Sequence, residues 1–146
     1  MEDRLKQPVA TAVLNRVLRI LCRSLPMYLD EVKPWVAADA RAACLELDRL
    51  TSDQRRFARR VAEAIVRHRG QPDPGSFPSQ YASFNDVDVA YLLQRIVDGL
   101  RADVEVLEHC AAELAISPVA CDLAEEVLGN LCGHLELLEK HVPDRA

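Results

Sequence analysis

This chain of 146 residues is long enough for one domain with a substantial hydrophobic core. Apolar residues make up 49% of it and aromatic residues only 5%, so the core must consist mainly of Leu, Val, Ala and Ile, a composition that favours helices. The net charge of −5 argues against a nucleic acid or an acidic membrane surface as partner. No apolar run reaches the roughly 18 residues of a membrane span, and the N-terminal segment lacks the apolar stretch of a signal peptide, so we expect a cytoplasmic protein.

The five cysteines form no Cys-x-x-Cys pair, and their number is odd. We expect three of them to be small buried side chains in a reducing compartment, because they lie in otherwise apolar helical patterns: Cys22, Cys44 and Cys132. A zinc site is not expected on this spacing.

The first predicted helix covers residues 8–31. Pro8 suits a position in the first turn, where a missing N–H breaks no hydrogen bond, and Pro26 should kink the helix. Apolar residues alternate at spacings of four and three along one face, as in a helix that packs in a bundle. They are Leu14, Leu18, Leu21, Leu25, Tyr28 and Val32.

The second predicted helix covers residues 36–69, after a turn at residues 33–35. Thr51 and Gln54 match a capping box, which leaves open a new helix start at Thr51. The unbroken apolar seam favours one long helix with Gly70 as its C-terminal cap. The seam consists of Ala43, Leu47, Leu50, Gln54, Phe57, Val61, Ala64 and His68.

Residues 70–84 form the longest break between helical patterns. Their prolines and glycines argue against a helix, and no alternation indicates a strand. Fifteen extended residues reach about 50 Å, whereas a helix of thirty residues is about 45 Å long. The segment is therefore long enough to cross over between the ends of two parallel helices.

Two further helices are predicted over residues 85–116 and 118–141. Asn85 suits the first N-cap, Ser117-Pro118 suits the start of the second, and Pro143 ends it. The connection between them is so short that they must be antiparallel neighbours. Their seams are Leu93, Val97, Leu100, Val104, Leu107, Ala111 and Leu114, then Ala120, Ala124, Val127, Leu131, His134, Leu138 and His141. Four helices with one long crossover predict a single all-α domain, residues 1–146, with the connectivity of a ferritin-like four-helix bundle.

Two short motifs support this connectivity: Leu14-Asn15-x-x-Leu18 with Tyr28-Leu29, and Gly133-His134-Leu135-Glu136-x-Leu138-Glu139. On these motifs the chain resembles the ferritin-like superfamily, bacterioferritins in particular. Active members hold two irons with a glutamate from each of two helices and a Glu-x-x-His pair from each of the other two. The matching positions here are Leu21, Gln54, Phe57, Val97 or Asp98, Leu131 and His134.

Only His134 clearly keeps a ligand identity among these positions, with Asp98 as a second candidate. Iron in such a site requires anionic oxygen donors and imidazole, which leucine and phenylalanine do not supply. The resemblance therefore implies a bundle that has lost its di-iron centre. We expect Gln54 and His134 to bond each other or a buried water, because an unpaired buried polar group costs about 1–3 kcal/mol. The alternative is a weak metal or small-molecule site.

Two faces of the predicted helices are rich in arginine. The first carries Arg16, Arg19 and Arg23, and the second Arg55, Arg56, Arg59, Arg60, Arg67 and Arg69. We interpret both as solvated surfaces. A docking stripe on the first and an anion or nucleic-acid patch on the second are the alternatives, although no interleaved aromatic residues support the latter.

The sequence thus predicts a non-enzymatic binding or structural module, with no catalytic residues, no cofactor and no resident metal. The resemblance implies a homo-oligomer, most simply a homodimer. Neither a membrane nor a nucleic acid is expected as partner, and the sequence does not identify a protein or small-molecule partner. The alternative is a metal-dependent oxidase or iron-handling protein with atypical ligands such as Gln54, Asp98 and His134.

Overall fold

A computed structural model describes residues 2–32, 41–84 and 89–142. Its elements are α1 (Glu2–Cys22), α2 (Leu25–Val32), α3 (Arg41–Arg67), the 3-10 helix η2 (Ser79–Phe84), α4 (Val89–Glu113), the 3-10 helix η3 (Leu114–Ile116) and α5 (Pro118–Glu139). The described residues contain no strand, which confirms the all-α class. None of the described helices combines the length and the apolar composition that a membrane span requires. The predicted turn at residues 33–35, the Asn85 cap and Pro143 lie outside the described residues.

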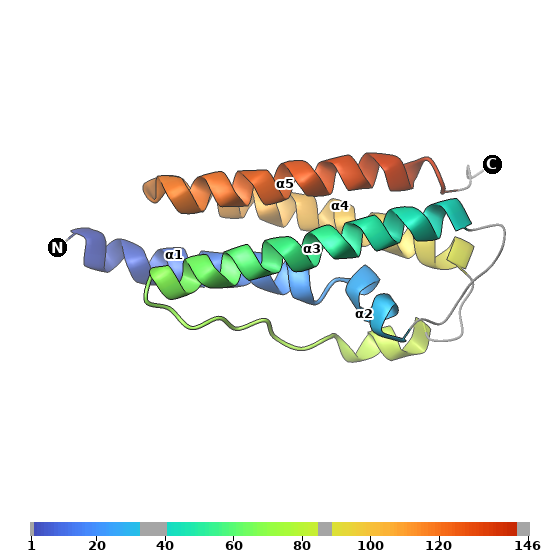
Figure 1. Ribbon diagram of the computed structural model, residues 1–146, viewed down its shortest axis with the longest axis horizontal. Coiled ribbons are helices and arrows are strands. Elements are labelled where there is room, and N and C mark those ends of the chain that lie inside the picture. The colour runs from blue at the N-terminus through green and yellow to red at the C-terminus, as the bar shows by residue number, and fades with distance from the viewer. Residues whose placement is uncertain (1, 33–40, 85–88, 143–146) are drawn as a thin grey trace.

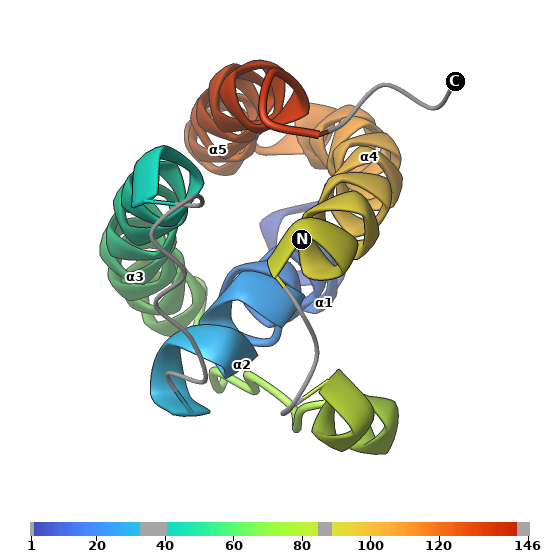
Figure 2. The same ribbon diagram turned by 90° about the vertical axis from the view of Figure 1, so that its right-hand side faces the viewer.

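The four long helices lie side by side around a common centre, in the order α1, α3, α5, α4 (Figure 2). Helices α3 and α4 run in the same direction, opposite to α1 and α5 (Figure 1). Residues 68–84, which follow α3, return along the length of the molecule (Figure 1), as the length of the crossover predicts. Helices α4 and α5 are antiparallel neighbours because only η3 and Ser117 separate them.

The predicted seams form the core. Their aliphatic members from α3 onward are buried, except for the partly buried Val104. The buried face of α4 is wider than its seam, because Leu92, Ile96 and Cys110 are also at most 1% exposed. Complete burial of one such aliphatic side chain stabilises a fold by about 1.5–3 kcal/mol. The helices are therefore held together mainly by these apolar stripes.

The prediction of one kinked helix over residues 8–31 is wrong. The chain breaks at residues 23–24, and α2 begins afresh with Ser24 as its cap, because the Met27 N–H donates to Ser24 Oγ over 3.3 Å. Pro26 then lies in the first turn of α2, where its missing N–H breaks no helical bond. Pro8 lies inside α1, which begins at Glu2, so its predicted position in the first turn is also wrong.

The crossover lies against the arginine face of α1. The Asn15 amide donates to the Gln71 carbonyl over 3.1 Å and accepts from the Asp73 N–H over 2.8 Å. Arg19 pairs with Asp73 over 2.9 Å, and Arg23 Nε donates to a crossover carbonyl over 2.7 Å. The interpretation of this face as merely solvated is therefore wrong for Arg19 and Arg23, which bind the crossover.

The last part of the crossover is helical, contrary to prediction. Residues 79–84 contain neither glycine nor proline and form η2. Its rings are partly buried, with Tyr81 5.7 Å from Tyr28 and 6.5 Å from Phe84 between ring centroids. The predicted break thus holds only for residues 70–78, where the prolines and glycines are concentrated.

The C-terminus of α3 carries the left-handed residue at Arg69, with φ of 63°, and not at Gly70. The Gly70 N–H donates to the Ile65 carbonyl and the Arg69 N–H to the Val66 carbonyl, each over 2.9 Å, which is a Schellman motif. Gly70 is required for space, because a Cβ there would lie 2.5 Å from Thr11 Cγ2. The glycine therefore allows the end of α3 to pack closely against α1.

We expect Gly70→Ala to lower the free energy of unfolding by about 1–3 kcal/mol, because the added methyl group overlaps Thr11. The matched control is Gly129→Ala in α5, where a Cβ meets nothing within 4 Å. That variant should gain about 0.5–1 kcal/mol from helix propensity. Urea unfolding followed by circular dichroism measures both, and equal effects of the two variants would contradict this account of Gly70.

Candidate functional site

Four of the positions that the resemblance matches to di-iron ligands lie in the apolar centre. Leu21, Phe57, Val97 and Leu131 are each at most 4% exposed. They come from α1, α3, α4 and α5, so each long helix contributes one. Iron requires oxygen or imidazole donors that these side chains lack. The centre is therefore packed with hydrocarbon at these positions.

Gln54 is buried in this centre, 2% exposed, but its partner is not His134. Its Oε1 accepts a hydrogen bond from Ser24 Oγ over 3.0 Å, and its Nε2 makes no hydrogen bond. The expected bond between Gln54 and His134 is thus wrong. The break between α1 and α2 brings the Ser24 hydroxyl to the glutamine, and the continuous seam gave no sign of this break.

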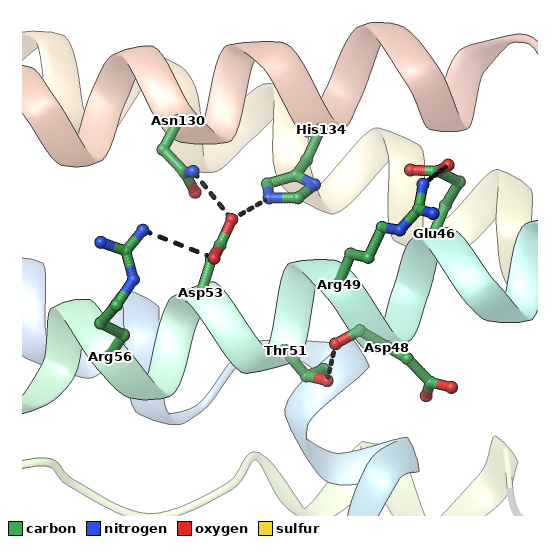
Figure 3. A network of polar contacts seen from close by, with 8 residues as sticks. All are labelled: Glu46, Asp48, Arg49, Thr51, Asp53, Arg56, Asn130 and His134. Atoms are coloured by element: carbon green, nitrogen blue, oxygen red, sulfur yellow. Dashed lines mark hydrogen bonds and ion pairs between the residues drawn. The ribbon is translucent and has the colours of Figure 1, made fainter.

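His134 instead bonds Asp53 of α3, over 2.7 Å from Nε2 to Oδ2 (Figure 3). The Asn130 amide donates to the same oxygen over 2.9 Å, and Arg56 lies 3.4 Å from the other. His134 Nδ1 is buried without a partner. Sequence reasoning missed Asp53 because it flanks the seam, one residue before Gln54.

These partners keep Asp53 ionised. Burial raises the pKa of its carboxyl, but hydrogen bonds from Asn130 and His134 and the nearby charges outweigh burial, so the pKa lies below its usual value. The carboxylate therefore joins α3 to α5 through two side chains of α5, Asn130 and His134. Its stabilising effect is fully present above pH 3.8 and is lost as pH falls through the lowered value.

Asp98 does not join Gln54 and His134. Its side chain is 52% exposed and bonds Gln94 over 3.0 Å and Arg101 over 3.4 Å on the surface of α4. Within the described part of the chain, no three His, Cys, Asp or Glu side chains gather as a metal site would need. The three atypical ligands that the sequence offered are thus not brought together.

The cysteines are less buried than predicted. Cys22, Cys44 and Cys132 are only partly buried, whereas Cys110 is fully enclosed. Burial raises the pKa of the Cys22 and Cys110 thiols. A raised pKa favours the unreactive thiol over the thiolate at neutral pH.

Three of the six arginines on the predicted basic face pair with acidic side chains. Arg55 pairs with Asp30 of α2, Arg56 with Asp53, and both terminal nitrogens of Arg60 bond Glu126 of α5 over 2.8 Å. These pairs occupy guanidinium groups that an anionic ligand would otherwise contact. Two arginines of this face, Arg55 and Arg60, thus contact the neighbouring helices α2 and α5.

A pocket of about 400 Å³ opens where the α1–α2 break, η2 and α4 meet. Its volume lies within the roughly 300–1,000 Å³ of small-molecule sites. Its apolar walls are Leu25, Pro26, Tyr81, Phe84, Ile96 and Leu100, and its polar lining is Ser24, Gln80, Arg95, Asp98 and Asp103. An apolar cleft with a few polar groups is the form that ligand sites take.

Asp103 is the distinctive group in this pocket. It makes no hydrogen bond or ion pair with the described residues, and burial raises the pKa of its carboxyl to about 7. Burial and the charge of Asp103 also raise the pKa of Tyr81. Sequence reasoning missed Asp103; the available signal was an acidic residue flanking the α4 seam between Leu100 and Leu107.

A series of contacting aromatic rings extends from α2 to α4. Tyr28 and Phe77 contact Tyr81, which contacts Phe84, and Phe84 contacts Tyr91, with ring centroids 5.7–6.5 Å apart. The Arg95 guanidinium lies over the Phe84 and Tyr91 rings, 5.5 and 5.8 Å from their centroids. One side of the pocket is thus an aromatic wall that already contacts one cation.

Comparison of the chain with protein-family models, with curated proteins and with solved structures finds no match. The likeness to ferritin-like proteins stays a prediction from the motifs and the helix connectivity.

We expect Asp53→Asn to lower the free energy of unfolding by about 1 kcal/mol at pH 7, because its charge-assisted bonds are lost. The difference should shrink below pH 3.8, where the wild-type carboxyl also becomes neutral. Chemical unfolding at pH 7 and below pH 3.8 measures it. Asp122→Asn, an exposed carboxyl of α5, is the control, and a pH-independent loss at Asp53 would rule out this role of the charge.

Asp103→Asn should stabilise the protein by about 2 kcal/mol at pH 8.5, because the native state then no longer holds a partly buried, unpaired charge. Because the pKa of Asp103 is raised in the folded state, the folded state binds one more proton than the unfolded state between about pH 4 and 7. Wild-type stability should therefore fall as pH rises from about 4 to 7, and the variant should lose this slope. Urea midpoints at pH 4, 6 and 8.5 test this, with Glu105→Gln on the exposed face as control. Parallel pH curves for wild type and Asp103→Asn would contradict it.

Proposed function

We propose that this chain is a non-enzymatic binding module, built on a ferritin-like four-helix bundle that has lost its di-iron centre. The observation that carries the proposal is the hydrocarbon at the matching positions, where Leu21, Phe57 and Leu131 are each at most 4% exposed. A centre of this kind supports folding but offers no metal chemistry. Function is then expected elsewhere on the molecule.

The pocket beside α4 is the binding site in this proposal. It combines apolar walls, a volume of about 400 Å³ and the unpaired carboxyl of Asp103. Retaining an unpaired, partly buried acid opposes folding, which is typical of residues kept for function at the cost of stability. The ligand is a small molecule with an apolar body.

The alternative is a metal-dependent oxidase or iron-handling protein. One observation favours it: Asp53 adds a carboxylate 2.7 Å from His134, and both are donor types that iron accepts. Glu46, on the same helix as Asp53, has one buried carboxylate oxygen without a partner (Figure 3). This reading places the metal between α3 and α5.

Two further proposals follow from the sequence. The resemblance to ferritin-like proteins implies a homodimer, and the unpaired cysteine pattern implies a reducing, cytoplasmic setting. Light scattering coupled to gel filtration measures the first directly. A monomer at micromolar concentration would remove the dimer from the proposal without affecting the pocket.

The decisive test is metal content after aerobic incubation with ferrous iron and desalting, measured by elemental analysis. We expect iron near background, because the centre lacks donors. His134→Leu serves as a comparison, since it removes the one imidazole at a matching position. About two irons per chain in the wild type, lost in this variant, would replace the binding module with the oxidase.

A further inference from the structure

We propose that the pocket beside α4 binds a small apolar amine, whose ammonium group pairs with the Asp103 carboxylate while its apolar body lies against Tyr81 and Phe84. This inference rests on the proposed function and names the ligand class of the same site. Its basis is the juxtaposition of one unpaired carboxyl with an aromatic wall inside a pocket of about 400 Å³.

Asp103 is the lining group that is available to a cation. Asp98 also lines the pocket, but it already bonds Gln94 and Arg101. Asp103 has no such partner in the described residues and is partly buried. A bound ammonium would supply the missing counter-charge, in surroundings where a charge pair is screened less than in water.

The aromatic wall suits the same ligand. Ring faces attract cations within about 6 Å of their centroids, and Arg95 already shows such contacts with Phe84 and Tyr91. Tyr81 and Phe84 line the pocket itself. An amine with an aryl or alkyl body would bury apolar surface there while its charged end meets Asp103.

The charged and titratable groups around Asp103 set the pH dependence. On α4 these are Arg95 and Asp98, and on η2 the phenol of Tyr81. The pocket residues of the α1–α2 break carry no charge. Arg95 is eight residues from Asp103, which places the two about 12 Å apart along the helix axis. The ammonium group of an amine bound at Asp103 is therefore much closer to the Asp103 carboxylate than to the Arg95 guanidinium.

The test compares a cation with its neutral analogue. 2-Phenylethylamine and 2-phenylethanol are titrated into the full chain at pH 8.5 and 5.5, with binding followed by ligand-observed and protein NMR. At pH 8.5 we expect the amine to bind about 10- to 100-fold more tightly than the alcohol, as for a charge-assisted bond. At pH 5.5 Asp103 is protonated, so this advantage should disappear while the alcohol is unaffected.

Two variants locate the site. Asp103→Asn, which should fold at least as stably as wild type, should remove the preference for the amine but keep binding of the alcohol. Gly99→Leu should block both probes, because Gly99 lines the pocket and lies one turn from Asp103. A Cβ at Gly99 meets nothing within 4 Å, as at Gly129 of α5, so Gly129→Leu is the matched control and should bind both probes.

The outcomes distinguish failure of the proposed ligand class from failure of the pocket as a binding site. Amine preference that survives Asp103→Asn, or equal binding of both probes, would overturn the ligand class but keep the pocket as a site. Phenylacetate is titrated in the same way, and tighter binding of phenylacetate than of the amine would overturn the ligand class in favour of an anion at Arg95. Binding of neither probe, or binding that Gly99→Leu leaves unchanged, would overturn the pocket itself and with it the proposed binding module.

Discussion

The contact on which much of this structure depends is the one between Asn15 and the crossover. A backbone that runs along a helix surface has polar groups that no regular ladder satisfies. The Asn15 amide satisfies two of them, accepting from the Asp73 N–H and donating to the Gln71 carbonyl. Arg19 and Arg23 continue this attachment toward η2. The arginine face of α1 is thus the surface against which the crossover packs.

The pocket is a consequence of this attachment. The crossover places η2 near the α1–α2 break, and residues of both segments line the pocket together with residues of α4. Tyr81 and Phe84 of η2 then form one wall, and α4 supplies the opposite one. A straight helix through residues 23–24 would leave Ser24 without its capping role and would remove its contact with Gln54. The break and the crossover therefore create the cavity together.

Periodicity predicted the core well, because burial in helices repeats along the chain. Nearly every aliphatic seam residue of α3, α4 and α5 is buried, and the start of α5 at Pro118 was predicted correctly. The candidate site was predicted poorly, because periodicity identifies the buried stripe of a helix and not the polar residues beside it. Asp53 and Asp103 flank their seams, and their surroundings depend on which other helix or loop approaches. A single sequence carries no signal for that approach, nor for the helical turn of η2.

Two partly buried carboxyls, Asp53 and Asp103, differ in how their charge is compensated, and the difference indicates where function resides. Asp53 is surrounded by donors from Asn130, His134 and Arg56, so its charge is compensated and it serves to join α3 to α5. Asp103 has no such compensation, and its ionised form opposes folding at neutral pH. A purely structural core position would gain stability from an amide or a hydrocarbon there. The uncompensated acid is explained if its counter-charge arrives with a ligand.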